Sequence, residues 1–297
     1  MTIATGTASW TDKTLISSGW YPREAKRAED RLKYYAARFP LVEVDSTYYA
    51  LPTPQVAQLW AERTPADFTF NIKAYRVFTA HQTRLQALPK DIKEALGNSA
   101  LESYYYQDLP TEIAVELWKR FWAALEPLRK AGKLGAVLFQ YPPWFVKKRS
   151  NIEHVLLCAQ ILEGNRLALE FRNSTWFNEK HTAATLDFER EHDFTHVIVD
   201  EPQGTPYSIP TIWEVTSPKL AMVRLHGRNA ATWQAKGLAS AAERFNYLYS
   251  EEELRELAPK VKRLEEETAT VHVLFNNCYS DKGVRNAATF LDLLKSA

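Results

Sequence analysis

Eight short segments rich in β-branched and apolar residues recur along the chain, and most are followed by a segment with apolar residues at helical spacing. The predicted strands span residues 3–10, 41–49, 68–75, 135–141, 167–174, 195–201, 221–228 and 271–277. Strands that alternate with helices favour a parallel sheet covered by helices. Eight such units in 297 residues predict an α/β fold, a (β/α)₈ barrel of the TIM type, as one domain over residues 1–297.

The helical segments and the missing phosphate motifs support this choice over an open doubly wound sheet. The predicted helices span residues 29–39, 90–100, 111–125, 151–163 and 179–192, with further helices that begin at Pro54 and that carry Leu254 to Leu264 and Val284 to Leu294. An open sheet normally has a glycine-rich phosphate turn after its first strand. Gly6-Thr7-Ala8-Ser9 does not match that turn, and the chain has no Walker A sequence.

Three long segments interrupt the alternation of strands and helices. Residues 76–110 form an excursion after the third strand, residues 202–218 a proline-rich loop after the sixth, and residues 229–249 a polar loop after the seventh. Long loops of a barrel commonly carry specificity. We therefore expect residues 77–110 or residues 229–249 to cover part of a cleft at the mouth of the barrel.

The composition excludes several classes of protein. The chain has 37 lysine and arginine residues and 36 aspartate and glutamate residues. This near-neutral charge gives no reason to expect nucleic acid to bind over the whole surface. The two cysteines, Cys158 and Cys278, cannot form a disulfide framework or a four-ligand zinc site. The sequence shows no signal peptide and no apolar run of about 20 residues. We expect a cytoplasmic protein without a membrane partner.

Polar residues gather where the predicted strands end, which is the end of a barrel that carries chemistry. The predicted catalytic residues are Lys73, Glu170, Asp200 and His226. The predicted substrate-binding residues are Trp10, Tyr48, Gln140, Arg172, Arg224, Arg228, Asn276 and Asn277. Strand alternation places Arg224, His226 and Arg228 on one face of the seventh strand.

These arginines predict an anion site. Charges inside a barrel are costly unless they are paired or used, and a guanidinium suits a phosphate or a carboxylate. We expect a small anionic ligand to bind among Arg172, Arg224, His226 and Arg228. We also expect five residues far apart in the sequence to converge at one end of the barrel: Glu170, Arg172, Arg224, His226 and Asn276.

Several functions remain open at this point. A metal-free hydrolase or lyase would use His226 as its general acid or base. A divalent-metal phosphoesterase would use Glu170, Asp200 and His226 with Glu43 or Asp45, and would bind Mg²⁺ or Mn²⁺. A nucleotide or single-stranded nucleic-acid binding protein would use the cations with aromatic residues such as Trp10, Trp144 and Trp233, and is the less favoured alternative. The sequence requires no cofactor, although a divalent metal is possible.

Eight short motifs, in order, give the chain its resemblance to a known family. They are Gly6-Thr7-Ala8-Ser9-Trp10, Glu43-Val44-Asp45-Ser46-Thr47-Tyr48-Tyr49, Lys73 through Thr79-Ala80-His81, Phe139-Gln140-Tyr141-Pro142-Pro143, Leu169-Glu170-Phe171-Arg172 with Ser174-Thr175-Trp176, Asp200, Arg224-Leu225-His226-Gly227-Arg228-Asn229, and Phe275-Asn276-Asn277 with Asn286-Ala287. On these motifs the chain resembles the domain of unknown function 72 family, the YecE-like proteins. The resemblance implies a TIM-type barrel and supplies no reaction.

The chain departs from that family's pattern at three motifs. The family often has Ser-Gly-Trp where Ala8-Ser9-Trp10 stands, and asparagine where Asp45 stands. It often has His-Pro-Ser-Trp where Asn173-Ser174-Thr175-Trp176 stands. A mechanism built on that histidine is therefore not carried over to Asn173, and Asp45 adds a carboxylate to the expected site.

Overall fold

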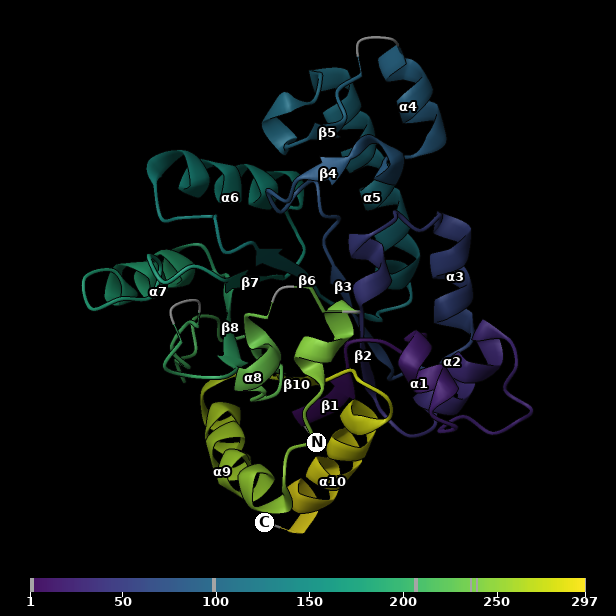
Figure 1. Cartoon of the computed structure of the whole chain (residues 1–297), viewed down its shortest axis with the longest axis vertical. Coiled ribbons are helices and arrows are strands. Elements are labelled where there is room, and N and C mark those ends of the chain that lie inside the picture. The colour runs from purple at the N-terminus through teal and green to yellow at the C-terminus, as the bar shows by residue number, and fades with distance from the viewer. Residues whose placement is uncertain (1–2, 98–99, 206–207, 236, 239, 297) are drawn as a thin grey trace.

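The computed structural model of the chain describes residues 3–97, 100–205, 208–235, 237–238 and 240–296. Eight parallel strands form a closed barrel in the order β1-β10-β9-β8-β7-β6-β3-β2 (Figure 1). They are β1 (Ile3–Thr7), β2 (Leu41–Val44), β3 (Thr69–Lys73), β6 (Leu134–Tyr141), β7 (Leu167–Phe171), β8 (Thr195–Asp200), β9 (Ala221–Leu225) and β10 (Val271–Phe275). The predicted (β/α)₈ fold is confirmed.

Helices surround the barrel and bury their apolar faces against it. They are α1 (Lys13–Ser17), α2 (Ala28–Ala36), α3 (Pro54–Glu62), α5 (Thr111–Lys130), α6 (Arg149–Ile161), α7 (Thr182–Glu191), α9 (Glu251–Glu267) and α10 (Lys282–Ser296). The Thr53 hydroxyl caps α3 and Ser250 with Glu253 forms a capping box on α9, so both helices begin where their sequences favour it. Within the described ranges, no helix is long and apolar enough to cross a membrane.

The excursion after β3 forms a small subdomain at the top of Figure 1. It contains β4 (Thr83–Arg84), α4 (Lys90–Leu96) and β5 (Ser103–Tyr104), and β4 pairs with β5 antiparallel. Phe78 stacks on Trp118 of α5 with ring centroids 3.6 Å apart, which anchors the excursion to the helical layer. The helix predicted over residues 90–100 ends at Leu96 before Gly97, and Asn98 and Ser99 lie outside the described residues.

Strand register decides which side chains face the barrel interior. On β8, His196 contacts Glu189 of α7, so His196 and Asp200 face the helices, whereas Val199 and the following Glu201 face inward. Val199 pairs with Arg224 of β9, which also faces inward. His196, Ile198 and Asp200 therefore share the outer face of β8.

The barrel closes between β1 and β2 through a short seam. These strands pair only at Gly6 with Leu41 and at Thr7 with Val42. The buried hydroxyl of Tyr35 on α2 extends the seam, because it accepts the Thr7 N–H at 2.7 Å and donates to the Leu41 carbonyl at 3.0 Å. A side-chain hydroxyl therefore completes the ladder that positions β2.

We predict that Tyr35→Phe lowers the free energy of unfolding by about 1–3 kcal/mol, because the buried Thr7 N–H loses its partner. Urea denaturation measures the change. Tyr34→Phe is the matched control, since the Tyr34 hydroxyl has no recorded hydrogen bond to a described residue, and we expect less than about 0.5 kcal/mol there. Equal stability of the two variants would show that the hydroxyl does not support the seam.

Candidate functional site

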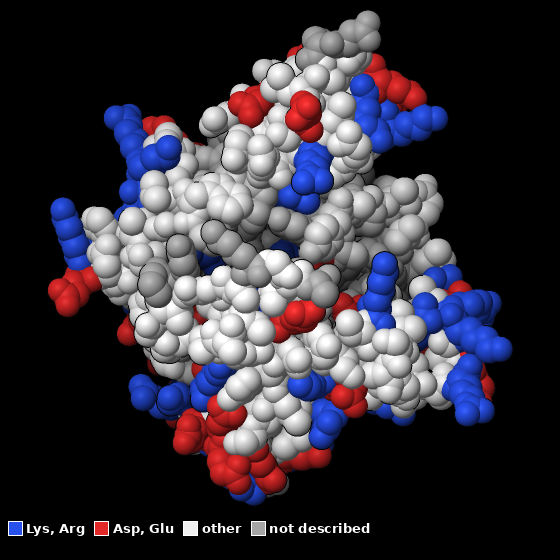
Figure 2. Space-filling view, in the orientation of Figure 1, with Lys and Arg blue, Asp and Glu red and all other residues white. Residues whose placement is uncertain are grey.

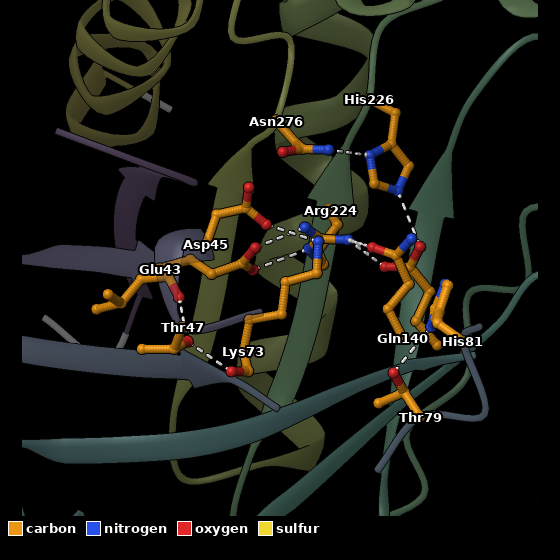
Figure 3. A network of polar contacts seen from close by, with 12 residues as sticks. Glu43, Asp45, Thr47, Lys73, Thr79, His81, Gln140, Arg224, His226 and Asn276 are labelled. Atoms are coloured by element: carbon orange, nitrogen blue, oxygen red, sulfur yellow. Dashed lines mark hydrogen bonds and ion pairs between the residues drawn. The ribbon is translucent and has the colours of Figure 1, made fainter. Parts of the chain in front are cut away.

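Arg224 lies at the centre of the candidate site, inside the carboxyl end of the barrel (Figure 3). Its Nε and Nη2 donate to the two oxygens of Glu43 on β2, at 2.9 and 2.6 Å. Its Nη1 donates to Glu170 on β7 and, at 3.3 Å, to the amide oxygen of Gln140 on β6. The side chains of Arg224, Glu43 and Glu170 have no exposed surface. A ligand could reach the Arg224 guanidinium only by displacing one of these partners.

Glu170 joins this buried pair to the rest of the site. Besides Arg224, it accepts from Arg172 Nη1 at 3.0 Å and from His226 Nε2 at 3.2 Å. Asn276 contacts the other ring nitrogen of His226 at 2.7 Å. Although burial opposes it, Arg224 and His226 hold the pKa of Glu170 well below its usual range. The five residues predicted to converge therefore do so in one hydrogen-bonded network.

His226 has a defined protonation state in this network. The Asn276 Nδ2 donates to His226 Nδ1, so the ring hydrogen is on Nε2 and points to Glu170. Burial lowers the pKa of His226 to about 4, against the opposing effect of Glu170. The imidazole is neutral near pH 7 and both of its nitrogens are occupied. No ring nitrogen of His226 is therefore free for a substrate, so the structure gives no support for the predicted role as general acid or base.

The loop after β9 covers His226, as expected for residues 229–249. Trp233, on the short helix α8 (Ala230–Trp233), lies 6.2 Å from the imidazole, and Phe245 lies 6.0 Å from it, measured between ring centroids. The Arg172 guanidinium lies 5.2 Å from the Trp233 ring. Two aromatic side chains thus shield the network from water on this side.

A second group of polar residues lies at the rim of the barrel around Tyr48. Lys73 Nζ, at the end of β3, donates to Asp45 at 2.6 Å and lies 5.0 Å from the Tyr48 ring. The Arg76 guanidinium lies 5.3 Å from the same ring. Its Nη2 donates to the Gln82 carbonyl, and its buried Nε has no hydrogen-bond partner among the described residues.

The rim depends on a turn where a longer strand was predicted. β2 ends at Val44 rather than at residue 49, and Asp45–Tyr48 form a 3₁₀ turn. The Thr47 hydroxyl contacts the carbonyls of Val44 and Lys73, at 2.7 and 2.5 Å, and fixes the turn over the end of β3. Asp45 and Tyr48 therefore reach Lys73 from the side of the barrel mouth.

His81 completes the rim, and it was quoted in a motif but not among the predicted site residues. The Thr79 hydroxyl donates to the Arg76 carbonyl, so it accepts the hydrogen of His81 Nδ1 at 2.9 Å. His81 Nε2 then carries a lone pair, with no recorded partner among the described residues. The His81 ring lies 5.1 Å from Tyr48. Burial, with the charges of Lys73 and Arg76, lowers the pKa of His81 to about 3.

Two residues predicted for the site, Asp200 and Arg228, pair with each other outside the barrel interior. Arg228 Nη2 donates to Asp200 at 2.8 Å, and Arg228 Nη1 donates to Glu253 of α9 at 3.0 Å. The common face predicted for Arg224, His226 and Arg228 ends at His226, because β9 ends at Leu225 and Gly227 has φ +89°. The convergence of three arginines on one anion is therefore absent from this arrangement.

Trp10 and Asn277 also lie behind the strands. Trp10 is buried against Trp60 of α3, with ring centroids 5.7 Å apart. Asn277 Nδ2 donates to the Tyr247 carbonyl and to Asn286 of α10. Both follow strand ends in the sequence, yet both pack between the barrel and its helices.

Glu201, which the sequence analysis did not select, takes the inward position next to Asp200. Its carboxylate contacts Arg172 Nη2 at 2.7 Å and accepts the Ile209 N–H at 2.9 Å. Arg172 is thus held between Glu170 and Glu201. The alternation of side chains along a strand places Glu201 and Asp200 on opposite faces of β8. The sequence alone did not show which of these faces points into the barrel.

Asn173 stands where the family often has histidine, and here it organises a turn. Its Oδ1 accepts the backbone N–H of Thr175 at 2.9 Å and the Thr175 hydroxyl at 2.6 Å. Its Nδ2 donates to the Pro143 carbonyl. These contacts engage both the oxygen and the nitrogen of the amide. Asn173 therefore does not replace the ring nitrogen that a histidine would offer at this position.

The residues at the mouth do not fit a divalent metal ion. Across the described part of the chain, no group of three or more His, Cys, Asp or Glu is arranged to hold one. Glu43 and Glu170 are both bound to Arg224, and Asp45 is bound to Lys73. A cation placed among them would meet the positive charges that already neutralise these carboxylates.

Comparison with known proteins places the chain in a family. A family model described as protein of unknown function DUF72 matches residues 4–297. The chain belongs to the DUF72 family. The UPF0759 protein YunF of Bacillus subtilis (strain 168) is 31% identical over 291 residues, which cover 97% of this chain and 93% of YunF. The UPF0759 protein YecE of Escherichia coli (strain K12) is 28% identical over 131 residues, 43% of this chain and 47% of YecE.

Two solved structures of DUF72 proteins resemble this barrel. The protein from Enterococcus faecalis V583 has a TM-score of 0.80 at 27% identity, over 99% of this chain and 95% of that chain. The protein from Thermotoga maritima MSB8 has a TM-score of 0.75 at 30% identity, over 99% of this chain and 100% of that chain. The names of these relatives state a family and no reaction, so function has to be argued from the site.

We predict that the stability advantage of the wild type over His226→Gln shrinks as the pH falls from 6.5 to about 4. The unfolded histidine binds a proton near pH 6.5, whereas folded His226 stays neutral down to about pH 4. The unfolded state then binds more protons, so the advantage falls by up to about 1.4 kcal/mol per pH unit. Urea denaturation at several pH values measures it, with the exposed His192→Gln as control. An advantage that grows on acidification would mean a charged imidazolium paired with Glu170.

Proposed function

We propose that the chain is an enzyme that acts on a small phosphate- or carboxylate-bearing substrate at the mouth of the barrel. The observation that carries this proposal is Arg76: a partly buried guanidinium with no carboxylate partner among the described residues and with an unpartnered Nε. It lies beside Tyr48 together with Lys73. Two cations that share one aromatic neighbour form a suitable site for an anion.

The inner arginines do not offer such a site. Glu43, Glu170 and Glu201 surround Arg172 and Arg224, so three carboxylates face two guanidiniums and leave no positive charge unpaired. Among the described residues, Lys73 has one hydrogen-bond acceptor, Asp45, and an ammonium group can donate three hydrogen bonds. The space-filling view shows lysine or arginine atoms within a hollow at the centre of this face (Figure 2). The anion site is therefore proposed at the rim.

His81 is the proposed general base. Its Nε2 lone pair would accept a proton from the substrate or from an attacking water, while Lys73 and Arg76 stabilise the negative charge that develops. In the free protein burial, together with these two cations, holds the pKa of His81 down. A bound anion offsets their charge and raises the basicity of His81 when the substrate is present. The reaction would be of a hydrolase or lyase type.

A binding protein for nucleotides or single-stranded nucleic acid is the second candidate. Two large aromatic side chains near the rim, Tyr49 and Trp144, are 58% and 57% exposed, and exposed aromatic rings beside cations suit stacked bases. Nucleic-acid binding would weaken steeply with added salt, whereas turnover of a small substrate would not. The phosphoesterase alternative that needs a divalent metal is set aside, because the carboxylates are bound to cations.

We predict that inorganic phosphate binds the wild type and that Arg76→Gln weakens this binding by about 10- to 100-fold, the loss of one charged hydrogen-bond donor. Isothermal titration calorimetry at low salt measures the dissociation constant. Arg228→Gln is the matched control, because Arg228 is paired with Asp200 and Glu253, and it should stay within twofold. A loss of phosphate affinity in Arg228→Gln, with unchanged affinity in Arg76→Gln, would show that the anion does not bind at the rim.

We predict that His81→Gln lowers kcat by about 10²- to 10⁴-fold on any compound that the wild type turns over, because the proton acceptor is lost. A panel of phosphate- and carboxylate-bearing compounds, assayed for released phosphate or acid, provides the substrate. Phosphate affinity should stay within about threefold, and the exposed His192→Gln serves as control. Full activity in His81→Gln would contradict its role. Phosphate binding without turnover of any compound would favour the binding protein.

A further inference from the structure

We infer that the groove beside His81 is a second subsite, which receives a planar heteroaromatic part of the substrate. The groove has a volume of about 430 Å³, in the range of small-molecule sites. The substrate would then join an anionic group to an aromatic ring, as a mononucleotide does. This inference rests on the proposed function, because it names the substrate class of the same site.

Large apolar side chains, which proteins usually bury, are exposed on the walls of the groove. Trp144, Leu157 and Tyr105 line it and are 57%, 40% and 37% exposed. They come from three separate segments: the loop after β6, helix α6 and the excursion after β3. Large apolar side chains that are exposed together in one groove often mark a binding site, whereas single exposed ones do not. Such walls match the flat face of an aromatic ring.

The groove is continuous with the proposed catalytic base. Trp144 Nε1 donates to the Ala80 carbonyl at 3.3 Å, and the Trp144 and His81 rings lie 5.7 Å apart. His81 in turn lies 5.1 Å from Tyr48, the neighbour of Lys73 and Arg76. Ala80 also lines the groove, with φ +57°, a left-handed conformation that is strained for alanine. A ligand with its ring on Trp144 and its anion at the rim would pass His81 Nε2.

Polar groups in the groove favour a ring that carries N–H donors. His154 Nε2 lies 2.7 Å from the Phe78 carbonyl, which can only accept, so the ring hydrogen is on Nε2 and Nδ1 is an acceptor. Burial lowers the pKa of His154, which keeps this acceptor available near neutral pH. Asn151 Nδ2 donates to the Val146 carbonyl at 2.8 Å, which leaves its Oδ1 as a second acceptor. Both residues line the groove. An amino-substituted heterocycle fits these acceptors better than a hydrocarbon ring does.

The test compares adenosine 5′-monophosphate, ribose 5-phosphate, inorganic phosphate and adenosine by isothermal titration calorimetry on the full chain. We expect the nucleotide to bind the wild type about 10-fold or more tighter than ribose 5-phosphate, the gain of one stacked base. Trp144→Ala should abolish that difference and leave ribose 5-phosphate affinity within twofold. Val115→Ala, an exposed apolar position on α5, is the matched control and should keep the difference.

The remaining outcomes separate this inference from the proposed function. Equal affinity of the wild type for the nucleotide and ribose 5-phosphate would overturn the subsite. A nucleotide advantage that survives in Trp144→Ala would overturn it as well. Adenosine binding that is lost in Trp144→Ala, without binding of any phosphate, would support the subsite and overturn the anion site. Binding of a single-stranded oligonucleotide far tighter than the mononucleotide, with steep salt dependence, would overturn the small substrate.

Discussion

The register of the strands at the mouth of the barrel is tied to the ion pairs of Arg224, whose charged side chain is fully buried. Moving a guanidinium from water into a barrel costs several kcal/mol, which two carboxylates from opposite parts of the barrel offset through close hydrogen bonds. Glu43, Arg224 and Glu170 come from β2, β9 and β7, so the ion pairs require all three strands to keep their register. Such a network adds little stability over an apolar core of the same volume. Its position at the carboxyl end of the barrel strands therefore supports the proposed site.

The buried network and the rim have different roles. Glu170 links Arg224 to His226, and His226 contacts Asn276. Each polar side-chain atom of Arg224, Glu170 and His226 contacts a neighbour. The rim has unmatched groups: Arg76 lacks a carboxylate and His81 Nε2 lacks a partner among the described residues. A fixed inner layer with unsatisfied groups above it is the arrangement expected of a preorganised site. The ligand would complete the hydrogen bonding that the rim leaves open.

The sequence predicted the fold and the convergence of the network, because strand alternation and strand ends follow from local patterns. It did not predict which arginine meets which carboxylate, since Glu43 and Arg224 are 181 residues apart and meet only after the barrel closes. Asp200 was chosen over Glu201 because period two gives two faces without naming the inner one. Arg228 was misplaced because the turn at Gly227 ends the alternation. His81 reaches the rim through an irregular turn that no local period describes.

A crystal structure of the protein soaked in inorganic phosphate would test the central claim, that the anion binds at the rim above an intact buried network. The account predicts phosphate in contact with Lys73 Nζ and Arg76, within hydrogen-bond distance of His81 Nε2, while Arg224 keeps both carboxylates. Phosphate bound instead to Arg172 or Arg228, or inserted between Arg224 and Glu170, would contradict it.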